Sequence, residues 1–227
     1  MLTFDPHLEI LSAAQQRLWL ELKPAANLGF ILYGGTAIAL QLGHRQSIDF
    51  DFFSDKKLKK ELLRDTFSFF KTSTLLQDRE ESLTIAVPFS DSIPVKISFF
   101  GNLSFGRIGE PHSTRDGIMQ VASLEDLMAT KLKVLFQCVE SKDYIDIAAM
   151  IYAGASLSHG LAAASAMFGS AFQPSECLKA LTYFHGRDLH LLTDEIKKSL
   201  IAASAGVHDL PSAHLLSSKL TPSSALS

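Results

Sequence analysis

The sequence predicts an α/β core followed by an all-helical region, and two observations carry that prediction. Up to about residue 121, short apolar runs with strand-like alternation are interleaved with segments of helical periodicity, as in mixed α/β domains. Beyond that point, apolar residues recur almost entirely at helical spacing. We therefore expect an α/β core over residues 1–119, a helical domain over 120–205 that completes a cleft with the core, and a flexible Ser-rich tail over 206–227.

The elements expected in the core follow from periodicity and from breaks at Gly and Pro. One amphipathic helix is expected from Pro6 to about Ala26, because Leu residues recur there at three- and four-residue steps. Leu58, Leu62 and Phe69 are expected to face inward from a second, lysine-rich helix. A short helix is expected over residues 36–42, the lysine-rich helix over 55–71, and strands over 30–33, 47–53, 82–89, 94–100 and near 117–121.

The helical region is expected to begin at Ser123, which together with Asp126 nearly matches a capping box. A broad apolar stripe then runs from Leu124 to Val139, which is typical of a helix packed along one side. Further helices are expected over residues 142–153, 158–169, 174–184 and 188–203.

Composition narrows the classes of function. Lys and Arg total 21 against 24 Asp and Glu, so the net charge of −3 offers no general positive field for nucleic acid. Two cysteines, Cys138 and Cys177, cannot build a disulfide framework, and no run of about 18 apolar residues is present to cross a membrane. The amino-terminal residues lack the pattern of a signal peptide, so we expect a cytoplasmic protein with no membrane contact. No His-Glu-x-x-His occurs, which argues against zinc hydrolase chemistry.

The segment from Tyr33 to Phe53 holds the residues best suited to chemistry. Side chains alternate along a strand, so Asp49 and Asp51 are expected on one face, where both carboxylates could bind a hard cation such as Mg²⁺. Gly34-Gly35 opens a helix whose backbone N–H groups could receive phosphate oxygens. Phosphates and a divalent metal would then meet between these two elements.

Lys131 lies on or beside the apolar stripe of the helical region. An ammonium among apolar neighbours is costly unless it reaches an anion, so Lys131 either contacts phosphates or snorkels at the edge of the stripe. Asp143 and Asp146 follow one helical turn apart. Asp143 could cap the helix start, and the alternative is a salt bridge with Lys131 or Arg45. Arg45 itself could contact phosphate, brace Asp49 or form a surface salt bridge.

The spacing between Gly34-Gly35 and Asp49-x-Asp51 resembles the signature of polymerase-β-like nucleotidyltransferases. More narrowly, residues 34–53, Lys131 and the Asp143-x-x-Asp146 helix resemble the AbiEii/AbiGii toxin family of nucleotidyltransferase-like proteins. The resemblance covers roughly residues 30–152 and implies a nucleotidyltransferase-like mixed sheet core. It implies catalytic and metal-binding roles as follows: Asp49, Asp51, Lys131 and Asp143 in catalysis, with Asp49 and Asp51 on Mg²⁺. It implies nucleotide-binding roles for Gly34, Gly35, Thr36, Arg45, Ser47 and Lys131.

The function implied by this resemblance is Mg²⁺-dependent transfer of a nucleotide from a nucleoside triphosphate (NTP) to an RNA, such as a tRNA end, or to a protein acceptor. Such a protein would be the toxin of a toxin–antitoxin or phage-defence system, with a cognate antitoxin as partner. The lysine cluster of residues 56–60 could guide an RNA backbone or simply be a solvated helix face.

Two departures from the family pattern support an alternative. The strand expected to supply a third carboxylate, residues 94–100, carries Lys96 and Ser98 instead, and serine cannot replace a carboxylate as a base. Cys138 stands where related proteins often carry an arginine. The alternative is a catalytically weakened nucleotide-binding or regulatory protein that keeps the nucleotide site without the third carboxylate.

Overall fold

The computed structural model describes residues 2–135 and 139–222, so Cys138 lies outside the described residues. The chain divides into two compact units. Unit 1 contains residues 1–106, 110–122 and 218–227, and unit 2 contains residues 107–109 and 123–217, each taken over its described part.

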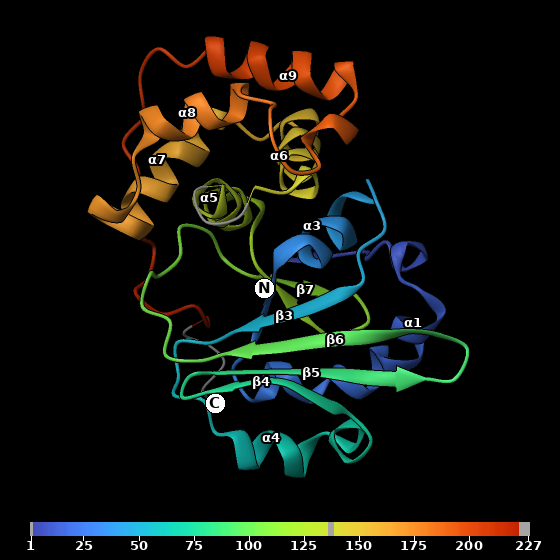
Figure 1. The fold of residues 1–227 in the computed structure, drawn as a ribbon. Coiled ribbons are helices and arrows are strands. Elements are labelled where there is room, and N and C mark those ends of the chain that lie inside the picture. The colour runs from blue at the N-terminus through green and yellow to red at the C-terminus, as the bar shows by residue number, and fades with distance from the viewer. Residues whose placement is uncertain (1, 136–138, 223–227) are drawn as a thin grey trace. The chain divides into compact units, whose positions relative to one another are not determined.

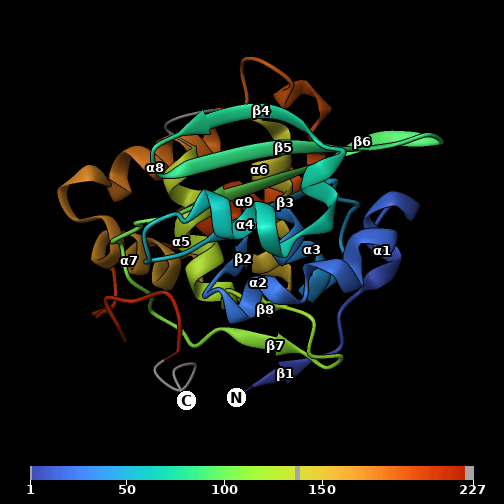
Figure 2. The ribbon, with the colours of Figure 1, turned by 90° about the horizontal axis from the view of Figure 1, so that it is seen from below.

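Unit 1 is built on one mixed sheet of eight strands, whose order is β1-β7-β8-β2-β3-β6-β5-β4 (Figure 2). The central strands β3 and β6 run parallel, whereas β2 lies antiparallel on the other side of β3. The strands are β1 Thr3–Phe4, β2 Ile31–Tyr33, β3 Asp49–Phe53, β4 Thr74–Arg79, β5 Ser82–Phe89, β6 Ser92–Phe100, β7 His112–Thr114 and β8 Gln120–Val121.

The helices expected over residues 6–26 and 55–71 are shorter in the structure, whereas α3 begins two residues earlier than expected. Helices α3 and α4 lie on opposite faces of the sheet (Figure 1). They are α1 Ala13–Trp19, α2 Pro24–Asn27, α3 Gly34–Leu42 and α4 Lys60–Thr66, with 3₁₀ turns at Leu8–Ile10, Leu20–Leu22 and Ser68–Lys71. The single helix expected over residues 6–26 is therefore wrong. Ser12 starts a new helix there through a capping box with Gln15, and Pro24 opens another.

The lysine-rich helix expected over residues 55–71 begins only at Lys60. The chain before it is held by loop contacts, since the Leu58 N–H donates to Glu81 Oε2 at 2.9 Å. The buried side of the helix also differs from the expected one. Leu62, expected to face inward, is 44% exposed, and Leu63 is buried in its place.

The core beneath the sheet is aromatic. Phe50 and Phe52 of β3 are buried, as period-two alternation requires of the residues that flank Asp51. The Phe99 ring of β6 lies 5.3 Å from that of Phe52, and the rings of Phe30 and Phe67 also surround it, at 5.2 and 5.7 Å. This packed layer makes β3 and β6 a rigid support for the side chains on their opposite face.

Strands β1, β4 and β7 were not expected from the sequence. In β4, five of the six residues are exposed and none is buried, because this strand forms an edge of the sheet. A strand without a buried face has no alternating pattern to recognise.

Unit 2 is helical. Its α-helices are α5 Leu124–Val134, α6 Ser141–Tyr152, α7 Leu157–Phe168, α8 Pro174–Thr182 and α9 Asp194–Ala205, with 3₁₀ turns at Gly169–Ala171 and Leu189–Leu191. Ser123 caps α5 as expected, accepting a bond from the Asp126 N–H at 3.1 Å. The helix expected from residue 188 begins instead at Asp194, after the cap residue Thr193. Gly160 of α7 packs so closely on α5 that a Cβ would lie 2.4 Å from Met128 Cγ.

Ser217 and Leu220, which follow the last helix, make hydrogen bonds through their backbone to earlier parts of the chain. In unit 2, the Arg107 N–H donates to the Ser217 carbonyl at 2.9 Å. In unit 1, Leu220 is fully buried and its N–H donates to Asp55 Oδ1 at 3.1 Å. Ser217 and Leu220 thus each make a specific hydrogen bond within the unit to which they belong.

Among the described residues, no single helix has both the length and the apolar character needed to cross a membrane, although the bent pair Ser141–Tyr152 and Leu157–Ala171 meets that test jointly on length and composition alone. Cys177 is a buried free thiol, and burial raises its pKa to about 12. The thiol is therefore an inert part of the unit 2 core.

Candidate functional site

Strand β3 presents its two carboxylates on one face of the unit 1 sheet. Asp49 and Asp51 are half-buried, while Phe50 and Phe52 between and beyond them are buried on the other face. Strand alternation alone produces this arrangement, so the expectation of a shared carboxylate face agrees with the structure.

Strand β6 places its own side chains directly beside these carboxylates. The parallel register pairs Asp49 with Lys96 and Asp51 with Ser98. Paired residues of neighbouring strands point to the same face, and Lys96 Nζ lies 2.8 Å from Asp49 Oδ2. The residues beside the two aspartates on β6 are thus a lysine and a buried serine.

The turn between β2 and α3 brings backbone close to Asp51. Gly34 has a φ of +75°, which favours glycine, and a Cβ at this position would lie 2.8 Å from Asp51 Oδ2. Helix α3 begins at this glycine after Tyr33, and no side chain of the described residues caps it. The first turn of an uncapped helix carries N–H groups and a positive dipole end that suit an anion.

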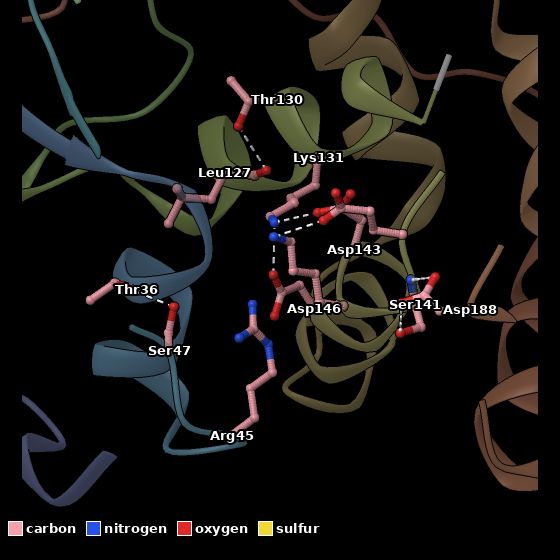
Figure 3. A network of polar contacts seen from close by, with 12 residues as sticks. Thr36, Arg45, Ser47, Leu127, Thr130, Lys131, Ser141, Asp143, Asp146 and Asp188 are labelled. Atoms are coloured by element: carbon pink, nitrogen blue, oxygen red, sulfur yellow. Dashed lines mark hydrogen bonds and ion pairs between the residues drawn. The ribbon is translucent and has the colours of Figure 1, made fainter. Parts of the chain in front are cut away.

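Thr36 and Ser47 form a buried brace between α3 and the start of β3. Thr36 Oγ1 lies 2.8 Å from Ser47 Oγ (Figure 3). It also donates a hydrogen bond to the carbonyl of Asp49. Both hydroxyls are buried. This brace fixes the helix start against the strand that carries the carboxylates.

Arg45 lies in the loop between α3 and β3 and is half-exposed. Its Nη1 donates to the Gln46 carbonyl at 2.9 Å. The loop therefore holds one end of the guanidinium within unit 1.

In unit 2, Lys131 of α5 is held by two carboxylates of α6 (Figure 3). Its Nζ lies 2.6 Å from Asp143 Oδ1 and 2.8 Å from Asp146 Oδ2. The exposed fractions of the three side chains are 9% for Lys131, 8% for Asp143 and 0% for Asp146. The snorkelling alternative for Lys131 is thus not what the structure shows, because the ammonium is buried against anions.

Neither aspartate caps α6. The first N–H of the helix and the hydroxyl of Ser141 both donate to Asp188, at 2.9 and 2.7 Å, and these bonds lower the pKa of the Asp188 carboxyl. Sequence reasoning missed Asp188, which lies 47 residues away in the chain. The salt-bridge alternative for Asp143 and Asp146 is the one that the geometry supports.

The two groups of predicted residues thus fall in different units. Unit 1 brings together Gly34, Gly35, Thr36, Ser47, Asp49 and Asp51, with Arg45 in the adjoining loop. Unit 2 brings together Lys131, Asp143 and Asp146.

A comparison with protein families matches residues 17–205 to the family described as the nucleotidyl transferase AbiEii toxin of a type IV toxin–antitoxin system. This match covers most of the chain and includes every residue of both groups. The chain belongs to the AbiEii nucleotidyl transferase toxin family.

Among solved structures, this AbiEii family member is similar to a crystal structure described as a "putative nucleotidyltransferase from H. pylori". The similarity covers 85% of this chain and 92% of that chain, with a TM-score of 0.54 and 16% identity. At that identity the likeness concerns the fold alone. A search of curated proteins found no significant match.

The nucleotidyl transferase family suggests a divalent metal ion, and the carboxylates of unit 1 are the residues to test for it. Within the described part of the chain, no group of three or more His, Cys, Asp or Glu side chains could hold a metal by itself. Mg²⁺ commonly binds through one or two carboxylates and takes its remaining ligands from substrate phosphates and water. Asp49 and Asp51, beside the start of α3, match that mode of binding.

Proposed function

We propose that this protein transfers a nucleotide from an NTP to an acceptor in a Mg²⁺-dependent reaction. One observation carries the proposal. Two carboxylates share a sheet face, and the backbone of Gly34, at the start of the uncapped helix α3, approaches one of them closely. A metal-bound triphosphate requires anionic metal ligands next to donors for phosphate oxygens.

The residues of unit 1 would hold the metal and the phosphates. Asp49 and Asp51 are the proposed Mg²⁺ ligands, and the ion would neutralise the negative charge of the triphosphate. The N–H groups of Gly34, Gly35 and Thr36 are the proposed phosphate donors. The brace between Thr36 and Ser47 supports this role indirectly, because it holds those donors in place relative to Asp49.

Lys131 is proposed to contribute positive charge for the phosphates, as the family resemblance implies. Its bonds to Asp143 and Asp146 support a fixed and oriented ammonium. An ammonium has three donors, and two of them are used by these carboxylates. Asp143 is then proposed as the residue that orients Lys131, and Arg45 as a further contact for phosphate.

The acceptor is proposed to be an RNA, such as a tRNA end, or a protein, and the antitoxin of the same system is the proposed partner. Exposed Lys56, Lys57 and Lys59 follow β3 and would suit an RNA backbone, whereas Lys60 is bound to Asp78. We further propose that the protein acts in the cytoplasm.

A labelled-transfer assay tests the function. Each α-labelled NTP is incubated with the protein and bulk tRNA, and separately with the protein alone, with Mg²⁺ or with EDTA. We expect Mg²⁺-dependent label on one acceptor, and its loss by at least a hundredfold in Asp49→Asn and Asp51→Asn. Asp78→Asn is the matched control. Asp78 belongs to the same unit, but it lies on the edge strand β4 and binds Lys60.

One observation favours the second candidate, a nucleotide-binding protein without transfer activity. The register places Ser98, not a carboxylate, beside Asp51. Calorimetric titration with each NTP separates the two candidates. Mg²⁺-dependent binding without label on tRNA or on the protein itself would favour the second candidate, and absence of binding would contradict both.

A further inference from the structure

We propose that Lys96 is a built-in cation of the carboxylate face, which takes the place of one metal ion and leaves room for at most one divalent ion there. This inference rests on the proposed function and specifies how the triphosphate charge is balanced. It assigns a role to a residue that lies outside the predicted nucleotide site.

The position of Lys96 is determined by the sheet. Strands β3 and β6 run parallel, and the register opposes Lys96 to Asp49. The ammonium lies 2.8 Å from Asp49 Oδ2, so one oxygen of the carboxylate already has a positive partner. Phe99 and Phe52, packed behind the two strands at 5.3 Å, keep this register from slipping.

The neighbouring position removes the ligand that a second metal would need. Two-metal sites hold ions about 4 Å apart and share carboxylates between them. Here Ser98 stands beside Asp51, and serine is a weak metal ligand. Strand β6 therefore carries no carboxylate at position 98 and carries a lysine at position 96. Compared with a strand that has a carboxylate at 98 and a neutral residue at 96, its local charge is more positive by two.

The Lys96 ammonium is exposed enough to contact a bound ligand. The Lys96 side chain is 42% exposed and that of Asp49 is 25% exposed, so a ligand can reach both. Asp49 uses one of the three ammonium donors. The remaining donors suit a phosphate oxygen that would otherwise bind a second metal.

Counting bound Mn²⁺ by electron paramagnetic resonance, in the presence of a non-hydrolysable NTP analogue, tests this inference without measuring activity. We expect at most one ion per wild-type chain. In Lys96→Met we expect one additional ion or an affinity at least tenfold higher, because Asp49 loses its competing cation. Adding Ser98→Asp to Lys96→Met is expected to tighten the added site further.

Two controls keep the result interpretable. Lys60→Met removes a lysine that binds Asp78 in the same unit, and it is expected to leave the Mn²⁺ count unchanged. Lys96→Arg preserves the charge and is expected to behave as the wild type, with thermal melting confirming that each variant is folded.

Two bound ions in the wild type would overturn the inference while leaving the proposed function intact. An unchanged count and affinity in Lys96→Met would also overturn it. If the wild type binds no Mn²⁺ and Lys96→Met binds one, Lys96 competes as inferred but the metal dependence of the proposed function is wrong. If neither binds Mn²⁺, both proposals are wrong.

Discussion

Each unit contains a lysine bound to aspartate, and the two contacts differ in burial. In unit 1, Lys96 and Asp49 pair at 2.8 Å with 42% and 25% of their side chains exposed. In unit 2, Lys131 contacts Asp143 and Asp146 at 2.6 and 2.8 Å, with none of the three more than 9% exposed. Water competes with the first contact and is excluded from the second.

The difference in burial separates a contact that can be exchanged from one that cannot. A partly exposed pair loses little when one partner turns to a ligand, because water and the ligand replace the lost bond. A buried ammonium between two carboxylates has no such replacement, so its geometry is fixed by the fold. The partly exposed contact between Lys96 and Asp49 in unit 1 is accordingly the one suited to exchange ligands. The buried contacts of unit 2 are suited to hold the Lys131 ammonium in one position.

Removing the buried cation should produce the largest effect on stability. Lys131→Met leaves Asp143 and Asp146 without their shared cation, and we expect the free energy of unfolding to fall by about 3–5 kcal/mol. Urea denaturation measures this loss. Lys179→Met, which removes an exposed ion pair with Glu176 in the same unit, should change the value by less than about 0.5 kcal/mol. A loss below about 1 kcal/mol in Lys131→Met would mean that the cluster is not effectively buried.

Asp126 of unit 2 is a second buried carboxylate, and it should make the stability of the protein depend on pH. Burial raises the pKa of Asp126 to about 6, above its ordinary value of 3.8. Its Oδ1 accepts the Ile108 N–H at 2.7 Å, but Oδ2 is buried without a hydrogen-bond partner in the described structure. Between these two pKa values the folded state binds more protons than the unfolded state, so the contribution of Asp126 to stability falls as pH rises from about 4 to about 6.

Asp126→Asn removes this pH dependence. From pH 4.5 to pH 7.5, the wild type should lose about 2 kcal/mol relative to the variant. Urea denaturation at the two pH values, on wild type and variant in parallel, provides the difference. Parallel pH profiles for the two proteins would contradict a raised pKa at this residue.

The close approach of Gly34 to Asp51 should make Gly34→Ala more destabilising than an alanine substitution at a glycine in open space. Gly34→Ala meets both a positive φ of +75° and Asp51 Oδ2, whereas Gly117→Ala, in the same unit, meets a φ of +68° and open space. We expect Gly34→Ala to cost about 1 kcal/mol more than Gly117→Ala in thermal or urea unfolding. Only Gly34→Ala should weaken NTP binding. Equal effects of both substitutions on stability and binding would argue that the contact with Asp51 is unimportant.

The smallest effect is expected at the exposed ion pair. Lys96→Met should change the free energy of unfolding by no more than about 0.5 kcal/mol, because Asp49 can be solvated. The same urea series measures it. A loss above about 2 kcal/mol would mean that the pair is structural, and the contrast between the two units would then disappear.

The sequence by itself determined those features of the fold that depend only on residues close together in the chain. Alternation along residues 49–53 was sufficient to place both carboxylates on one face, and Gly34-Gly35 marked the turn into α3. Ser123 identified the start of α5 because an N-cap bond spans only three residues. The order of strand, glycine turn, helix and carboxylate strand therefore needed no knowledge of the fold.

Only the tertiary structure decided which distant residues meet. The register of β3 with β6 set Lys96 on Asp49, and the packing of α5 with α6 set Lys131 between two aspartates. For Asp143 the sequence left two roles open, capping of the helix start and an ion pair with Lys131 or Arg45, because the choice depends on which distant side chain lies beside it. Edge strand β4 and the inward turn of Leu63 in place of Leu62 likewise depended on contacts far along the chain, which no local periodicity encodes.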